Sequence, residues 1–388
     1  MWEFTSPRTI VFGEEALEYL KELEGKRAFI VSGRSVSKLG ITSRVEDSLL
    51  EAGMEVRVFD QVEPEPSVDT VTKGAKSMLE FCPDWIVGLG GGSSMDAAKA
   101  MWILYERPDM EVAMINPLER LGLRKKSRLL CIPTTSGSGS EATWATIITD
   151  PEGKVKMELP SREAVPDIVI LDPFLPSLMP PALTAQTGMD VLTHSVEAYA
   201  SQWRNDFSDA FAIKAIRLVF GYLPEAYRNG RSILAREKMH NASTMAGWAF
   251  SNSQVGIAHA MGHSLGALFK ISHGRCVGIF LPYSVEYSAL EVKDRYVEIA
   301  EAIGVEYAND DEALEGLLEA MKNLKRLIGE PDSIKNAGIP EDEFDAALDG
   351  LVDRAMTSAV TSVCPRIPSA DDYRKLFTCA FVGERISF

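Results

Sequence analysis

The sequence predicts an α/β fold in which an N-terminal doubly wound parallel sheet is followed by an all-helical second half. Short apolar runs alternate with helical patterns from residue 28 to residue 171, as in a parallel sheet covered by helices on both faces. Prolines then punctuate residues 173–181, and long helical patterns follow. The length of 388 residues suits two or three domains. We therefore expect an α/β domain over residues 1–178 and a helical domain over residues 179–388.

The predicted strands of the first half are short and rich in apolar or β-branched residues: 28–31, 56–59, 85–89, 129–132 and 168–171. Helical patterns lie between them, over residues 35–52, 67–81 and 95–105. Gly53 predicts the end of the first helix. Ser67 is the predicted N-cap of the second helix, and Asp69 in its first turn suits the positive end of the helix dipole.

The helical patterns of the second half cover residues 182–201, 208–222, 233–250, 294–304 and 311–328. One stretch, residues 239–269, contains no Asp, Glu, Lys or Arg, but it holds three histidines and several Asn, Gln, Ser and Thr side chains. These polar groups would be costly in lipid. We expect this stretch to be helical, buried inside the protein, and to line a polar region.

The composition excludes several classes of protein. With 46% hydrophobic and 25% charged residues the chain is expected to fold. A net charge of −16 argues against a general nucleic-acid or membrane-surface binder. The five cysteines are odd in number and form no CxxC motif, so a disulfide framework is not expected. The first residues lack the pattern of a signal peptide, so we expect a cytoplasmic protein.

Two loops at predicted strand ends favour a nucleotide. Strand 85–89 runs into residues 90–96, Gly-Gly-Gly-Ser-Ser-Met-Asp, just before a helix. A strand, a glycine cluster and a helix start offer backbone N–H groups to an anion. Strand 129–132 is followed by small and hydroxyl residues over 133–140, at the strand end where doubly wound sheets bind ligands. A ligand-free turn and a plain linker remain alternatives, since no P-loop lysine and no complete GxGxxG is present.

A third loop bears on the coenzyme. After strand 28–31 the chain reads Ser32-Gly33-Arg34-Ser35. In dinucleotide folds a carboxylate at this point binds the ribose 2′-hydroxyl, whereas an arginine suits a 2′-phosphate. The loop offers Arg34 and no carboxylate, which favours NADP over NAD; an ordinary surface arginine is the alternative.

The second half contains a pattern typical of metal ligands. Asp190 and His194 are four residues apart and share a helix face, His259 and His263 have the same spacing, and His273 follows. A single buried histidine is usually a hydrogen-bonded core residue. Several buried imidazoles without a ligand are costly, so the group favours a divalent metal bound by imidazoles and a carboxylate.

Other polar residues, in both halves of the chain, receive a structural interpretation. No glutamate directly follows His194 or His259, so the HExxH pattern of zinc proteases is absent. We expect Glu141 and Glu197 to stabilise the structure or to support residues that bind a ligand, and we expect His240 to lie on a helix surface.

The motifs GGGSSMDAAK, PTTSGSGSEAT, TGMDVLTHSVEAY and HAMGH together resemble the iron-containing (group III) alcohol dehydrogenase family over essentially the whole chain. The resemblance implies a Rossmann-like N-terminal domain that binds a nicotinamide coenzyme and a helical metal-binding domain, the fold shared with dehydroquinate synthase. It further implies that Fe²⁺ or Zn²⁺ lies in the cleft between the two domains.

The resemblance also assigns roles to particular residues. The implied metal ligands are Asp190, His194, His259 and His273. His263 is the implied catalytic residue beside the nicotinamide and the substrate. The implied coenzyme contacts are Gly91, Gly92, Ser93, Thr134, Thr135, Ser138 and Lys156. The loops described above add Gly33, Arg34, Ser35 and Asp96 as expected coenzyme contacts.

Two departures from the family pattern bear on the coenzyme. Members that prefer NAD carry an aspartate where this chain has Gly33, which agrees with a preference for NADP, although NAD is possible. Many members have Pro-Asn-Pro where this chain has Pro64-Glu65-Pro66, so contacts at Glu65 are expected to differ.

The implied function is hydride transfer between NADP(H) and a small primary alcohol or aldehyde, in a homodimer. A polyol or glycerol-type dehydrogenase and a dehydroquinate synthase-like enzyme on the same fold are alternatives. The synthase would need basic residues for a phosphorylated sugar acid, and no such cluster lies between Asp190 and His273. A binding protein without activity is a third alternative. The sequence does not choose between Fe²⁺ and Zn²⁺ or identify the alcohol.

Overall fold

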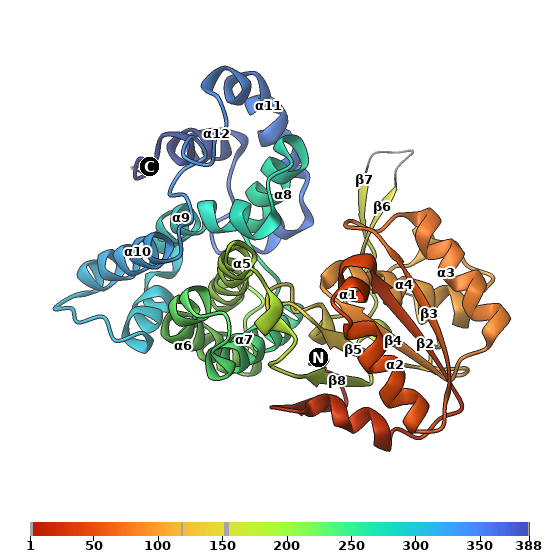
Figure 1. Cartoon of the computed structure of the whole chain (residues 1–388). Coiled ribbons are helices and arrows are strands. Elements are labelled where there is room, and N and C mark those ends of the chain that lie inside the picture. The colour runs from red at the N-terminus through yellow and green to blue at the C-terminus, as the bar shows by residue number, and fades with distance from the viewer. Residues whose placement is uncertain (1–2, 118, 151–154, 387) are drawn as a thin grey trace. The chain divides into compact units, whose positions relative to one another are not determined.

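The computed structural model describes residues 3–117, 119–150, 155–386 and 388. The chain divides into two compact units, Met1–Leu178 and Met179–Phe388 (Figure 1). The first unit contains a parallel sheet with helices, and the second is helical. This confirms the predicted fold class.

The sheet of the first unit has six parallel strands in the order β1-β8-β5-β4-β2-β3. Their bounds are β1 (Thr9–Phe12), β2 (Arg27–Gly33), β3 (Glu55–Val62), β4 (Trp85–Gly90), β5 (Arg128–Pro133) and β8 (Ile168–Leu171). From β2 the chain goes to one side to form β3, and it then crosses back to form β4 on the other side. The topological switch point, where ligands of such sheets bind, therefore lies between β2 and β4.

Helices cover both faces of this sheet: α1 (Arg34–Lys38), α2 (Ile41–Glu51), α3 (Val68–Phe81) and α4 (Gly92–Glu106). Successive side chains of β2 point to opposite faces of the sheet, as the two-residue period of a strand requires. Ala28 and Ile30 belong to the core formed with α2, and Phe29 and Val31 to the core formed with α3 and α4.

Two details of the predicted helices are tested here. The single helix expected over residues 35–52 is wrong, because the chain turns at Leu39 and Gly40 and forms α1 and α2 instead. The predicted N-cap of α3 is confirmed, since the Ser67 hydroxyl accepts the backbone N–H of Thr70 at 3.2 Å.

The sequence patterns missed three of the four-residue strands of the first unit. These are the edge strand β1 and the antiparallel pair β6 (Ile147–Asp150) and β7 (Val155–Glu158), each only four residues long. Figure 1 shows β6 and β7 projecting from their unit. Short 3₁₀ turns complete the chain: η1 (Ala16–Glu22), η2 (Val112–Met114), η3 (Ser140–Ala142), η4 (Arg162–Ala164), η5 (Pro176–Leu178) and η6 (Ala359–Val363).

The second unit consists of helices α5 (Pro181–Ala200), α6 (Asp206–Arg228), α7 (Ile233–Ser253), α8 (Ile257–Phe269), α9 (His273–Ala302), α10 (Asp310–Leu327), α11 (Glu341–Thr357) and α12 (Ala370–Val382). The predicted helices fall on α5, α6, α7, the end of α9 and α10. Helix α9 starts well before its predicted position and kinks at Val292, whose φ of −134° is not helical.

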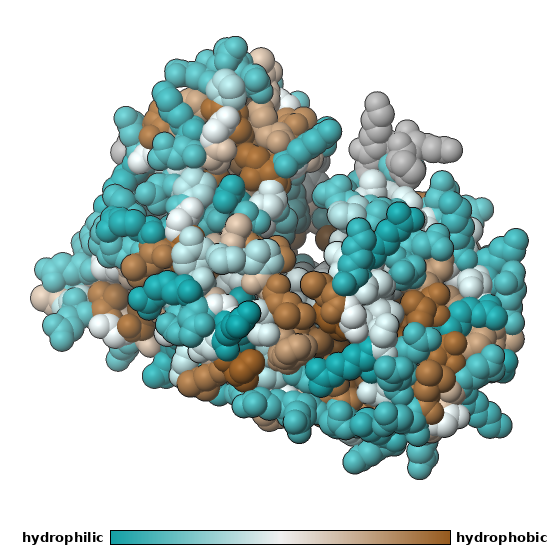
Figure 2. Space-filling view, viewed as in Figure 1, coloured by the Kyte–Doolittle hydropathy of each residue, from teal (hydrophilic) through white to brown (hydrophobic). Residues whose placement is uncertain are grey.

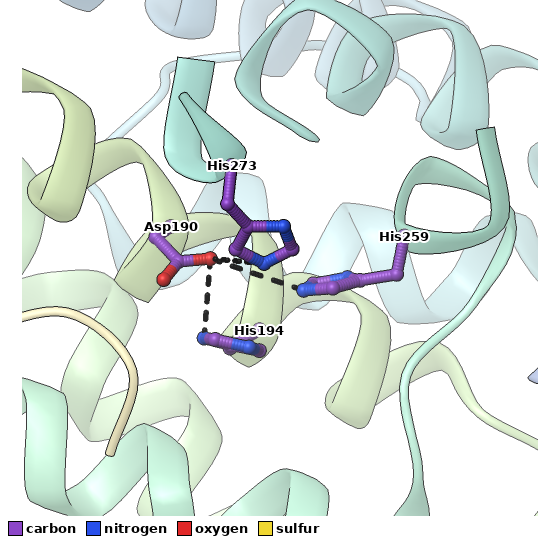
Figure 3. A group of neighbouring side chains, drawn as sticks. All are labelled: Asp190, His194, His259 and His273. Carbon is purple, nitrogen blue, oxygen red and sulfur yellow. Dashed lines mark ion pairs between the residues drawn. The ribbon is translucent and has the colours of Figure 1, made fainter. Parts of the chain in front are cut away.

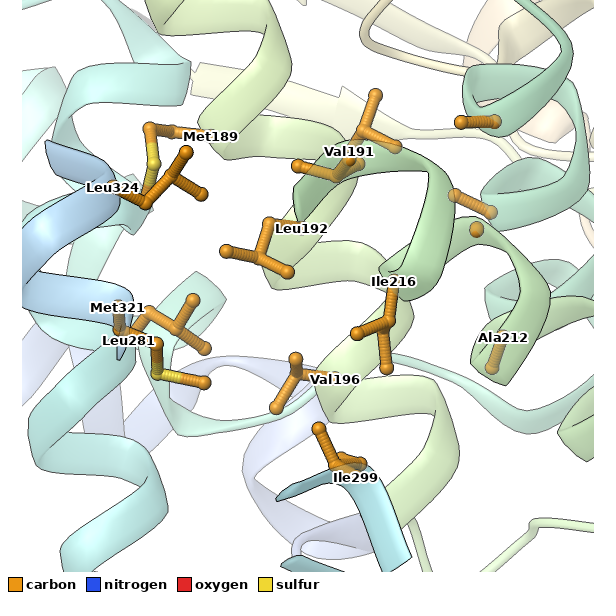
Figure 4. Close-up of a cluster of buried hydrophobic side chains, with 14 of the residues drawn as sticks. Met189, Val191, Leu192, Val196, Ala212, Ile216, Leu281, Ile299, Met321 and Leu324 are labelled. Carbon is orange, nitrogen blue, oxygen red and sulfur yellow. The ribbon is translucent and has the colours of Figure 1, made fainter. Parts of the chain in front are cut away.

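Helix α5 runs through the core of this unit. Its Val191, Leu192 and Val196 pack with residues of α6, α9 and α10 (Figure 4). From Gly188 to Ala200 every residue of α5 is buried. Polar side chains on this part of α5 therefore need partners inside the protein.

The uncharged stretch 239–269 forms the end of α7 and the whole of α8. Among the described residues no helix is both long and apolar enough to cross a membrane. The surface position expected for His240 is wrong, because α7 packs against α5 and α6 and leaves His240 only 1% exposed. The face of the molecule in Figure 2 is mostly hydrophilic, with hydrophobic side chains in small groups.

Candidate active site

Four predicted ligands converge in the second unit. Asp190 and His194 lie one turn apart on α5, His259 comes from α8, and His273 is the first residue of α9 (Figure 3). One potential donor atom from each of the four side chains can be chosen so that all lie within 4.8 Å of one another. From Asp190 Oδ1 the distances are 3.3 Å to His273 Nε2, 3.7 Å to His194 Nδ1 and 3.9 Å to His259 Nε2.

A glycine allows α9 to begin this close to α5. A Cβ atom on Gly274 would lie 2.1 Å from the carbonyl oxygen of Gln186 and 3.2 Å from Cβ of Asp190. Only glycine leaves room for that approach, which brings the neighbouring His273 to Asp190.

The burial and the polar atoms of the cluster fit a divalent cation. Asp190, His194 and His259 are each at most 5% exposed. Within the described part of the chain, Asp190 Oδ1, His194 Nδ1 and His259 Nε2 are buried and have no hydrogen-bond partner. Unpartnered buried polar atoms are rare, and finding three together needs an explanation. A cation coordinated by nitrogen and oxygen donors supplies one, and this donor set suits Fe²⁺ or Zn²⁺.

The protonation of these ligands also suits a metal. Burial lowers the pKa of His194 to about 3, so its imidazole is neutral at pH 7 and has a free lone pair. Burial alone would raise the pKa of Asp190, but the neighbouring imidazoles of His194 and His273 outweigh it and hold that pKa below its ordinary value. The carboxylate is therefore ionised and able to bind a cation.

His263 lies next to this cluster without being one of the four. It is on α8, one turn after His259, and is partly exposed. Its ring centroid is 5.1 Å from that of His273 and 5.9 Å from that of His259. Phe250 stacks on His194 at 4.2 Å between ring centroids and gives the cluster an apolar neighbour.

In the first unit, the predicted coenzyme loops meet at the carboxyl edge of the sheet. A Cβ atom on Gly92 would lie 2.9 Å from Ser138 Oγ, and one on Gly91 would lie 3.3 Å from Thr135 Oγ1. The loop after β4 and the loop after β5 are therefore in close contact. Gly92 is the first residue of α4, whose first backbone N–H groups have no partner within the helix and can receive an anion. Ser93 is the second residue of α4, and Thr134 begins the loop after β5.

Gly33, Arg34 and Ser35 lie on the other side of the switch point. A Cβ atom on Gly33 would be 3.7 Å from Ser94 Oγ, so this loop neighbours the loop after β4. Arg34 and Ser35 are exposed. The Arg34 guanidinium has no hydrogen bond or ion pair to any residue in the described ranges, and it is thus available to a ligand.

Lys156 approaches the same edge from β7. Its ammonium forms a 2.5 Å ion pair with Glu65, and the backbone N–H of Glu65 donates to Ser93 Oγ at 3.4 Å. Lys156 is therefore connected to the loop after β4 through Glu65, the position where this chain departs from Pro-Asn-Pro.

Comparisons with known proteins agree on one family. Residues 7–173 match the iron-containing alcohol dehydrogenase family, and residues 184–381 match the Fe-containing alcohol dehydrogenase family, C-terminal. An NADPH-dependent butanol dehydrogenase of Clostridium saccharobutylicum is 41% identical over 100% of both chains. The chain belongs to the iron-containing alcohol dehydrogenase family.

Other relatives of this dehydrogenase include longer proteins. Aldehyde-alcohol dehydrogenase 2 of Entamoeba histolytica is 37% identical over 97% of this chain, which matches only 46% of that protein. The solved structure of an iron-containing alcohol dehydrogenase from Thermococcus thioreducens has a TM-score of 0.90 and 33% identity, covering 99% of this chain and 100% of the other. Family membership makes this protein an oxidoreductase of the alcohol dehydrogenase class, and not a synthase.

One predicted coenzyme residue of this dehydrogenase has other partners. Asp96 Oδ1 accepts the hydroxyl of Ser140 at 2.6 Å, and Oδ2 accepts the backbone N–H of Ile147 at 3.1 Å. Both bonds connect α4 to the segment from the end of the second predicted coenzyme loop to the start of β6. Asp96 therefore holds this segment in place, whatever contact it makes with a coenzyme.

The sequence reasoning missed Lys99, which has the same partners. Its side chain is fully buried, and Nζ donates to the carbonyl oxygens of Ser140, Thr143 and Ala145 at 2.7, 2.9 and 2.9 Å. A signal was present, since Lys99 is the one charged residue in the apolar run Ala97–Leu104. A lysine inside a helix that is apolar all round must find buried acceptors.

Proposed function

We propose that this dehydrogenase reduces a short aliphatic aldehyde to the primary alcohol with NADPH, using Fe²⁺ or Zn²⁺ bound by Asp190, His194, His259 and His273. The observation that carries the proposal is the convergence of these four donors, three of them with buried atoms that lack a partner among the described residues. The reverse reaction, alcohol oxidation, uses the same groups.

The preference for NADPH is supported by the loop after β2. Arg34 is exposed and bonded to no described residue, and position 33, where a carboxylate would bind a ribose 2′-hydroxyl, is glycine. An arginine recognises a phosphate with paired N–H donors. The full-length relative from Clostridium saccharobutylicum is named as NADPH-dependent, which agrees with this assignment.

Different residues of the chain bind the coenzyme and transfer the proton. When bound, the divalent metal supplies Lewis-acid polarisation of a carbonyl oxygen, and the reduced nicotinamide supplies the hydride. Gly91, Gly92 and Ser93 hold the pyrophosphate, and Thr134, Thr135 and Ser138 orient the nicotinamide side. His263, partly exposed, exchanges the proton of the alcohol with solvent, since an imidazole can act as a general acid and base.

The surroundings of the cluster favour an alkyl substrate over a polyol. Phe250 covers one face of His194, so on that side the cluster has an apolar ring that offers no hydrogen bond to an extra hydroxyl. Butanol is the alcohol in the name of the relative from Clostridium saccharobutylicum.

The experiment is metal replacement under anaerobic conditions. The metal is stripped, Fe²⁺ or Zn²⁺ is added back, and oxidation of NADPH and of NADH is followed with butyraldehyde and with glyceraldehyde. We expect metal-dependent turnover, faster with NADPH and with butyraldehyde. Turnover favouring NADH would refute the role of Arg34. No turnover with any aldehyde or metal would refute the proposed reaction. Assembly as a homodimer stays a prediction, which light scattering tests.

A further inference from the structure

The proposed metal ligands have a fifth polar neighbour, Glu197, whose role the metal cluster does not by itself explain. Glu197 lies on α5, seven residues after Asp190 and three after His194, so all three project from one side of the helix. It is 5% exposed. A carboxylate this deeply buried needs several donors to offset its desolvation.

The structure supplies four donors to Glu197. Oε1 accepts the backbone N–H of Ala258 at 2.6 Å and the hydroxyl of Ser284 at 3.3 Å. Oε2 accepts the backbone N–H of Gly256 at 2.8 Å and lies 2.6 Å from Nδ1 of His259. Glu197 thus holds the start of α8 and one ring nitrogen of a proposed ligand at the same time.

These contacts determine which nitrogen of His259 carries the proton. A carboxylate that receives N–H bonds on both oxygens is an acceptor, so the 2.6 Å contact requires a proton on Nδ1 of His259. The other nitrogen, Nε2, is then left with its lone pair. Nε2 is the atom that faces Asp190 Oδ1 at 3.9 Å and lacks a partner among the described residues.

We propose that Glu197 is a positioning residue of the metal site, which fixes His259 as the Nδ1–H tautomer and directs the Nε2 lone pair into the cluster. The inference rests on the proposed metal site. A hydrogen-bonded carboxylate behind a histidine ligand fixes the ring and raises its basicity, and losing such a partner typically lowers metal affinity about 10–100-fold.

The first test uses the unaltered protein without metal. The chain contains five histidines, so nuclear magnetic resonance of the ¹⁵N-histidine-labelled protein gives few ring signals, and His259→Gln assigns those of His259. We expect a proton on Nδ1 of His259 that exchanges slowly with solvent, as its burial requires. A proton on Nε2 instead would overturn the proposal, whether or not any variant folds.

The second test compares Glu197→Gln with Glu106→Gln. Glu106 is a matched control, because it is 7% exposed and accepts the backbone N–H groups of Lys126 and Ser127, both at 2.9 Å, in the other unit. In Glu197→Gln an amide NH₂ must replace one oxygen. If the NH₂ group takes the place of Oε2, it faces Nδ1 of His259 and forces the ring proton onto Nε2. If the NH₂ group takes the place of Oε1, it faces the backbone N–H of Ala258, and two donors then point at each other.

Zn²⁺ affinity, measured by competition with a chelator, and the melting temperature of the metal-free protein are the readouts. Both variants are expected to melt earlier, but only Glu197→Gln is expected to lose Zn²⁺ affinity, by about 10–100-fold. A Zn²⁺ affinity within about threefold of the parent would mean that Glu197 only caps the start of α8, and it would overturn the proposal. If the parent itself binds neither Zn²⁺ nor Fe²⁺, the proposed function fails, and the tautomer of His259 still decides the inference.

Discussion

Replacing Lys99 by methionine is expected to destabilise the first unit severely. The two side chains have similar length, so the packing of α4 is largely kept while the charge and its donors are lost. Lys99 is fully buried, and its three carbonyl contacts at 2.7–2.9 Å connect α4 to the segment Ser140–Ala145. That segment follows the loop proposed to hold the nicotinamide, so NADPH affinity is expected to fall as well.

The size of the expected stability loss follows from the buried polar groups that lose their partner in Lys99→Met. Each orphaned carbonyl costs about 1–3 kcal/mol, although the segment relaxes and the costs do not add fully. The Asp96 carboxylate also loses the cation that favours its ionised form, although no ion pair joins the two side chains in the described part of the chain. Part of this is offset, because burial opposes the charged form of Lys99 and lowers its pKa. We expect a net loss of about 3–5 kcal/mol in the free energy of unfolding.

Urea unfolding at pH 7 measures this loss, and hydrogen exchange of amides in β4 and β5 assigns it to the first unit. Lys73→Met on the exposed side of α3 is the control, expected to change stability by less than about 0.5 kcal/mol. A loss below about 1 kcal/mol in Lys99→Met would refute the reasoning, because that is less than the cost of a single orphaned carbonyl.

Acid provides a further check on Lys99. Burial raises the pKa of Asp96, and Lys99 is the main charge that opposes this rise. Without Lys99 that pKa rises further, so the folded state binds a proton more readily than the unfolded chain. The penalty of Lys99→Met is therefore expected to shrink as the pH falls from 7 toward the ordinary aspartate value of 3.8.

Three other changes test separate parts of the molecule. Arg34→Ala is expected to lower kcat/KM for NADPH about 10–100-fold, the value of a charge-assisted hydrogen bond, and to leave NADH nearly unaffected; an equal fall for both coenzymes contradicts the 2′-phosphate assignment. His263→Ala is expected to keep bound Zn²⁺ and lose about 10²–10⁴-fold in turnover; loss of Zn²⁺ would move His263 into the ligand set. Lys325→Met is expected to raise the free energy of unfolding at pH 7 by about 1–3 kcal/mol, because burial lowers the pKa of Lys325 to about 8 and its nearest carboxylate, Asp332, is 3.8 Å away. Since the charged form opposes folding only below the unfolded value of 10.5, this gain disappears above that pH, and a gain that persists there has another cause.

The sequence by itself determined what depends on neighbours along the chain. The alternation of apolar runs and helical patterns predicts the parallel sheet, because each element must bury one face locally. The four-residue spacing of Asp190 and His194 places both on one side of α5, and Ser67 caps α3 as its residue type favours. Because the sheet is parallel, the loops that follow its strands lie at the same edge of the sheet.

The tertiary structure decided what depends on packing between distant segments. His263 has the same spacing from His259 as His194 has from Asp190, so spacing alone does not show which histidines converge; the family resemblance implied the set, and the folded chain shows it. That convergence depends on Gly274, where the contact of α9 with α5 leaves no space for a Cβ atom. β1 joins the sheet beside β8, more than 150 residues away, and its sequence does not show with which distant strand it pairs. Helical spacing predicts the face on which a side chain lies but not its partner, so the hydrogen-bond partners of Glu197 and Lys99 became visible only in the folded chain.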